Sequence, residues 1–82
     1  MKLSKTETQL IESARANGGR GGIETCYGRG SRGGKIKYGA RERDALFKLV
    51  NRGMAVITDR QPWQDYNNGY GVSGTVISFK LI

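Results

Sequence analysis

Histidine is absent from this 82-residue chain, and Cys26 is its single cysteine. Such a chain can form neither an internal disulfide bond nor a zinc site of the Cys/His type, and it lacks the imidazole that most often acts as a general base. We expect Cys26 to be a small buried residue, because a cysteine nucleophile needs an activating partner such as histidine. The composition therefore predicts no metal and no cofactor.

Long apolar runs are missing as well. No stretch of 18 apolar residues occurs, and the amino terminus has no signal-peptide core. These absences predict a cytoplasmic protein without a membrane partner. The length predicts a single domain over residues 1–82, with a core too small to enclose a large active site.

Negatively charged residues are scarce. The chain has seven acidic residues against 14 Lys and Arg residues, which gives a formal net charge of +7. Residues 1–14 and 61–82 each sum to zero, so the whole excess falls within residues 15–60. A clustered positive charge attracts phosphate and predicts a polyanionic partner. The plainer alternative is a basic protein whose charge serves solubility.

Two helices are predicted from end signals and apolar stripes. Ser4 and Glu7 have the spacing of a capping box, which predicts a helix over about 5–16. A second helix is predicted from Ala40 to Arg52, with an apolar face, an opposite face rich in basic residues, and a glycine after its end.

Glycine is concentrated in the segment 17–39, which holds nine of the 13 glycines and cannot be a stable helix. Short runs at 23–27 and 35–38 favour strands, so we predict a β-hairpin or loop with a basic tip. A flexible arginine-glycine segment of the kind found in RNA-binding tails is the alternative.

The carboxy-terminal part predicts two more strands, at 54–58 and 75–82. Between them we expect a long wing-like loop over residues 59–74, with a turn at Asn68-Gly69. The fold class predicted is therefore α+β, ordered α-β-β-α-β-β, with two helices packed on a small sheet of antiparallel hairpins.

Neither of two nucleotide-binding motifs typical of enzymes fits this sequence. A Walker loop needs a hydroxyl residue after the lysine, but Gly34-Lys35 is followed by Ile36. Gly28-x-Gly30-x-x-Gly33 has the spacing of a dinucleotide fingerprint, yet the chain is too short for the βαβ frame that such a site requires. The sequence predicts a protein that is not an enzyme.

Nucleic-acid binding has candidate residues of two kinds: cations that neutralise phosphates, and aromatic rings that stack on bases or cover the core. The candidates are Arg20, Arg29, Arg32, Lys35, Lys37, Arg41, Arg43, Lys48, Arg52, Arg60, Trp63 and Tyr66. We expect duplex DNA to be favoured, with RNA as an alternative ligand.

The run from Tyr38 to Ile57 resembles the recognition helix and following strand of winged helix-turn-helix proteins. The resemblance implies that Ala45 and Leu49 are core residues, and that residues 60–70 form a wing. It also implies DNA contacts by Arg41, Arg43 and Lys48. The chain departs from that family upstream, where the glycine-arginine segment takes the place of a second helix.

The small size and basicity are also similar to those of phage-encoded accessory proteins, including anti-CRISPR and other host-takeover inhibitors. This similarity implies a second function, namely binding to a host protein or nucleoprotein complex. The sequence leaves the oligomeric state open.

Overall fold

The computed structural model describes residues 2–30, 34–67 and 70–82, and these form two helices and a four-stranded antiparallel sheet. The predicted α+β class is confirmed. Along the chain the elements are α1 (Lys5–Ala16), β1 (Arg20–Arg29), β2 (Lys35–Tyr38), α2 (Ala40–Asn51), β3 (Ala55–Asn67) and β4 (Tyr70–Leu81). The strand order in the sheet is β2-β1-β4-β3.

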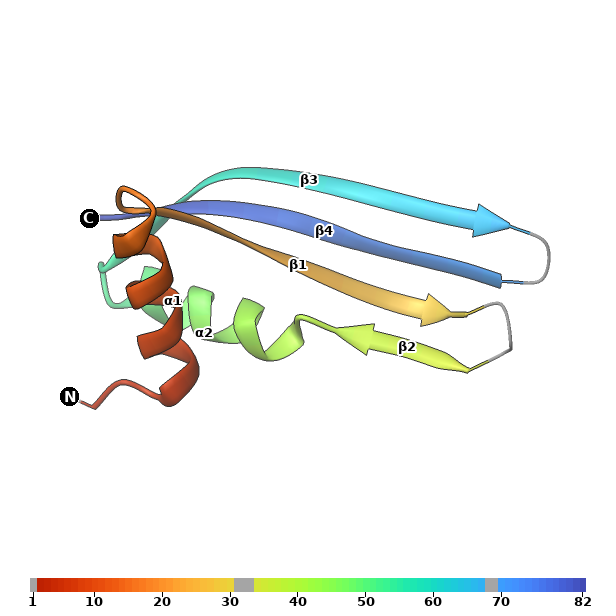
Figure 1. Cartoon of the computed structure of the whole chain (residues 1–82), viewed down its shortest axis with the longest axis horizontal. Helices are drawn as coiled ribbons and strands as arrows, with labels where there is room; N and C mark the ends of the chain where they lie inside the picture. The colour runs from red at the N-terminus through yellow and green to blue at the C-terminus, as the bar shows by residue number, and fades with distance from the viewer. Residues whose placement is uncertain (1, 31–33, 68–69) are drawn as a thin grey trace.

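The molecule is elongated because the sheet extends well beyond the helices. Both helices lie at one end of the sheet, and the carboxy terminus lies at the same end. The two hairpins project away from the helices (Figure 1). The principal extents are 45 × 23 × 22 Å, and the radius of gyration is 14.5 Å. A compact chain of this length has a radius of about 12 Å. We call the end of the sheet away from the helices the distal end.

Helix α1 begins at the predicted capping box. The Ser4 hydroxyl accepts a hydrogen bond from the Glu7 amide at 3.1 Å, and Glu7 Oε1 accepts one from the Ser4 amide at 3.3 Å. After the helix, Gly18 and Gly19 both have positive φ, and the Gly19 amide donates to the Ala14 carbonyl. The chain thereby turns directly from α1 into β1.

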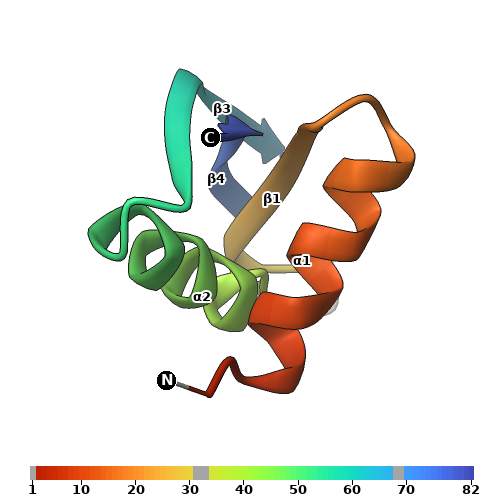
Figure 2. The same ribbon diagram turned by 90° about the vertical axis from the view of Figure 1, so that its left-hand side faces the viewer.

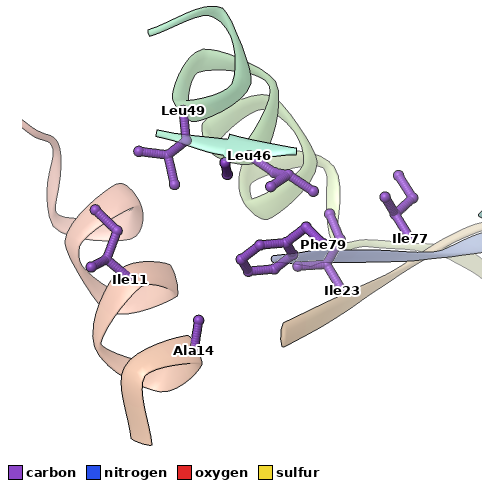
Figure 3. Close-up of a cluster of buried hydrophobic side chains, with 8 residues drawn as sticks. Ile11, Ala14, Ile23, Leu46, Leu49, Ile77 and Phe79 are labelled. Atoms are coloured by element: carbon purple, nitrogen blue, oxygen red, sulfur yellow. The ribbon is translucent and has the colours of Figure 1, made fainter. Parts of the chain in front are cut away.

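The core lies between the two helices and the near half of the sheet. Leu46 and Leu49 of α2 are fully buried, and they pack with Ile11 of α1 and with Ile77 and Phe79 of β4. Figure 3 shows these side chains converging, and Figure 2 shows the two helices beside the strands from the end of the molecule. The buried positions Ala45 and Leu49 agree with the core role that the winged-helix resemblance implied.

Strand pairing assigns each residue to one of two faces of the sheet. In an antiparallel sheet, paired residues point to the same face and successive residues alternate. Ile23 pairs with Ile77, and both are buried in the core, so they define the helix-side face. Every second residue of β1 and β4 counted from this pair shares that face. The intervening residues lie on the opposite face, which we call the outer face.

A β-bulge at Thr58 shifts this alternation in β3. Ile57 pairs with Phe79 and Arg60 pairs with Ile77, while Thr58 is skipped in the register. Ile57 and Arg60 therefore both lie on the helix-side face, although they are three residues apart. Beyond the bulge, the even-numbered residues of β3 share that face with the core.

The predicted wing-like loop over residues 59–74 is wrong. Residues 59–67 continue β3 and residues 70–74 begin β4, so the two strands form one long hairpin. Polar residues and Pro62 made this segment resemble a loop, but Pro62 lies in an edge strand, where a missing amide donor is tolerated. The turn predicted at Asn68-Gly69 falls outside the described residues.

The glycine-rich segment forms the predicted hairpin. Strand β1 is longer than expected and pairs with β2 at its distal end, where Arg29 opposes Lys35 and Tyr27 opposes Lys37. The alternative of a flexible tail is wrong for these paired residues. Strands therefore occupy the position at which winged-helix proteins have a second helix.

Candidate nucleic-acid interface

The distal end of the sheet separates charges by face. Tyr27, Arg29, Lys35 and Lys37 lie on the helix-side face, because their register is continuous with the Ile23–Ile77 pair. The carboxylates in the described parts of the strands, Glu24, Asp59 and Asp65, lie instead on the outer face. This separation leaves the positive charge of the distal helix-side face without strand carboxylates beside it.

Tyr66 of β3 completes this surface from the other edge of the sheet. It pairs with Gly71, which in turn pairs with Arg29, so one row across the sheet reads Tyr66, Gly71, Arg29 and Lys35. Tyr27 and Tyr66 are each 65% exposed, and Arg29, Lys35 and Lys37 are exposed too. We call Tyr27, Arg29, Lys35, Lys37 and Tyr66 the distal basic face.

A groove of about 320 Å³ adjoins the distal basic face where α2 begins. Lys37 and Arg43 contribute cations to its lining. Its other lining residues include Tyr27 and the hydroxyl-bearing Thr25, Ser73 and Thr75. Helix α2 starts after Gly39, which has no side chain to cap its amides. The Thr25 hydroxyl is already hydrogen-bonded to the Thr75 backbone. The cations and the other hydroxyl groups of the groove can bind an anionic group such as a phosphate.

The basic face of α2 expected from the sequence is divided between two surfaces. Arg43 lines the groove beside the distal basic face, whereas Arg41 and Lys48 line a different depression beside the start of α1. Arg43 also forms an exposed ion pair with Asp44, with 3.4 Å between Nε and Oδ1. Exposed pairs of this kind are weak, so Arg43 remains able to bind another anion.

Arg52 was predicted to contact nucleic acid, and the structure places it in an ion pair within the protein. Its Nη1 atom lies 2.9 Å from Oε2 of Glu7, whose side chain is buried. Burial raises the pKa of Glu7, but hydrogen bonds from Ser4 and the charges of Arg52 and Lys48 outweigh it and hold the pKa below its ordinary value. Arg52 thus stabilises a buried carboxylate between α1 and α2.

Three further candidates also lie away from the distal basic face. Arg20 is at the near end of β1 on the outer face. Arg60 is on the helix-side face, with its guanidinium carbon 5.6 Å from the centre of the Phe47 ring. The bulge places Trp63 on the outer face, opposite Gly74. Arg32 falls outside the described residues.

The outer face at this level has a different character. One row across the sheet contains Trp63, Gly74, Cys26 and Tyr38, and Cys26 is buried there as predicted. Partial burial raises the pKa of Tyr38, and contacts with Cys26 and Glu24 raise it further. Trp63 therefore belongs to a different surface from Tyr27 and Tyr66, whereas Tyr38 also lines the groove beside Tyr27.

Sequence reasoning missed Tyr27 and the hydroxyl groups of the groove. The alternation of Ile23, Thr25, Tyr27 and Arg29 was a usable signal, because it continues the buried face of β1 outward. Ser73 was hidden by the prediction of a loop over 59–74, and Thr75 was the first residue of the predicted strand 75–82, whose pairing partner was not known from the sequence.

Within residues 2–30, 34–67 and 70–82, no cluster of side chains could hold a metal ion, and neither helix has the length and apolarity needed to span a membrane. Comparison with models of known protein families, with curated proteins and with solved structures found no match.

Proposed function

We propose that the protein binds nucleic acid, with DNA as the expected ligand, through the distal basic face and the adjoining groove. The observation that carries this proposal is the sorting of charge: Arg29, Lys35 and Lys37 share one face, and the strand carboxylates lie on the other. Cations without neighbouring carboxylates are what a phosphate backbone requires, and their binding is accompanied by counterion release.

The groove provides a phosphate-binding position next to these cations. Lys37 belongs both to the distal basic face and to the groove lining, and Arg43 reaches the groove from α2. A backbone that crosses Arg29 and Lys35 would therefore meet further donors as it approaches the helix. Phosphate contacts of this type fix position and carry little sequence information.

Helix α2 is less suited to enter a DNA groove as a recognition helix. Its Arg52 is paired with Glu7, and Arg41 and Lys48 lie toward α1, away from Arg43. We therefore assign the main contacts to the sheet, and we keep Arg41 and Lys48 as secondary phosphate contacts.

The test compares two triple variants with equal net charge. Arg29→Ala, Lys35→Ala and Lys37→Ala together remove the cations of the distal basic face. Lys2→Ala, Lys5→Ala and Arg15→Ala remove three exposed cations in and near α1. Affinity for labelled duplex DNA, single-stranded DNA and RNA is measured by fluorescence anisotropy over a range of salt concentrations.

We expect the wild type to bind with a strong salt dependence. Removal of the distal cations should reduce the slope of log K against log salt on duplex DNA by about 2.7, at about 0.9 per phosphate contact. The α1 triple variant should retain most of the slope. Equal loss in both variants would mean that net charge alone drives binding, and the assignment of this face would then be wrong.

A further inference from the structure

The distal basic face holds two exposed aromatic rings, and one of them lies directly over a glycine. A side-chain carbon added at Gly71 would overlap the ring of Tyr66, so this ring occupies the space above the β4 backbone. Tyr66 is nevertheless 65% exposed. A ring that rests on the sheet and remains this exposed presents a surface to the solvent on which another flat group can stack.

Tyr27 provides a second exposed ring on the same face. It lies two strands away from Tyr66 and two residues nearer the helices along the strands, and it pairs with Ser73 of β4. Strand and residue spacings put the two tyrosine Cα atoms about 12 Å apart. Lys37 pairs with Tyr27, and Arg29 lies beyond Gly71 in the row of Tyr66, so each ring shares its row with a cation.

The shape of this face also limits how it can approach a duplex. Four strands are present at this level, and their edge strands are about 14 Å apart at ~4.8 Å per gap, before side chains are added. The major groove of B-DNA is about 12 Å wide. The sheet cannot lie flat in the groove, so on a duplex this face meets phosphates while its rings meet no bases.

We infer that the preferred ligand of the distal basic face is an unpaired nucleic-acid strand, whose bases stack on Tyr66 and Tyr27 while Arg29, Lys35 and Lys37 hold its phosphates. This inference rests on the proposed function and narrows it. Stacking depends little on nucleotide sequence, because every base has a flat face. The ligand is therefore recognised by its unpaired bases and not by a sequence motif.

The experiment measures the affinity for labelled oligothymidylate and for a duplex of the same length. Tyr66→Ala and Tyr27→Ala should each weaken oligothymidylate binding by about tenfold, and change duplex binding much less. Tyr66→Phe and Tyr27→Phe keep the rings and should retain the affinity. Trp63→Ala, on the outer face, is the matched aromatic control and should leave oligothymidylate binding unchanged.

Gly71→Ala tests the geometry without removing any group that touches the ligand. The added carbon must displace the Tyr66 ring, so the variant should lose oligothymidylate affinity as Tyr66→Ala does. Thermal unfolding of each variant checks that the fold is retained.

The outcomes separate the two proposals. Tyrosine variants that weaken duplex and oligothymidylate equally, or a wild type that does not prefer the single strand, would overturn the stacking inference and leave the proposed function standing. If the wild type showed no salt-dependent binding to any of the nucleic acids tested, the proposed function itself would be refuted.

Discussion

Arg52 at the end of α2 reaches Glu7 in the first turn of α1, with 2.9 Å between Nη1 and Oε2. The same carboxylate accepts a hydrogen bond from the Ser4 amide and so completes the capping box. One buried carboxylate therefore serves both the start of α1 and the packing of α1 on α2. Removal of either partner leaves a charge with less compensation in a partly buried position.

The stability of the protein should depend on the ionisation of Glu7. Its pKa is held below the ordinary value of 4.5 in the folded state, so the unfolded chain takes up the proton first as the pH falls. The stabilising contribution is complete above pH 4.5, and it is lost as the pH falls through the folded pKa. Urea denaturation at a series of pH values should show this acid-side loss.

Glu7→Gln should be less stable than the wild type at neutral pH, and its stability should vary less with pH below 4.5. Glu12→Gln, at an exposed position of the same helix, is the control and should keep the acid-side loss. An unchanged pH profile in Glu7→Gln would show that the ion pair contributes nothing to the pH dependence.

Gly39 should be irreplaceable at the junction of β2 and α2. Its φ is +85°, and a side-chain carbon there would overlap the Glu24 carbonyl oxygen and approach Thr25 Cα to 2.8 Å. We expect Gly39→Ala to lose at least about 2 kcal/mol of unfolding free energy. Gly34→Ala meets no atom within 4 Å and should be tolerated. Similar stabilities of the two variants would contradict the described junction.

Leu46 should carry a large share of the core stability. It is fully buried, whereas Leu10 is only partly buried at the edge of the core. Leu46→Ala should reduce the free energy of unfolding by about 2–5 kcal/mol, and Leu10→Ala should cost clearly less. Urea denaturation of both variants measures the difference, and equal losses would argue against the described packing.

The thiol of Cys26 should be protected in the native protein. The residue is 5% exposed, in the row with Trp63 and Tyr38 on the outer face. A thiol reagent should react with it slowly in buffer, and at the rate of a free thiol after unfolding in urea. Rapid reaction in buffer would show that this row of the sheet opens readily.

The helices could be predicted because their signals are local. A capping box lies within four residues, and an apolar stripe repeats within a turn, so Ser4, Glu7 and the leucines of α2 sufficed. The long β3–β4 hairpin could not be predicted in the same way. Its distal residues are polar and include Pro62. They adopt strand conformation because each pairs with a residue of the opposite strand.

The sequence predicted a candidate site of cations and aromatic rings, and the structure brings only some of the named residues together. Arg29, Lys35, Lys37, Arg43 and Tyr66 meet on or beside one face. Arg20, Arg52 and Trp63 had equally suitable side chains, but their partners in the fold turn them elsewhere.

The amino-acid sequence by itself determined the two helices, the glycine-rich hairpin and the excess of positive charge in the middle of the chain. The tertiary structure decided which charges share a surface. Side chains alternate with a period of two, so one skipped residue at Thr58 exchanges the faces of everything beyond it in β3. That bulge directs Tyr66 to the distal basic face and Trp63 away from it. The position of the bulge is set only by the pairing of β3 with β4.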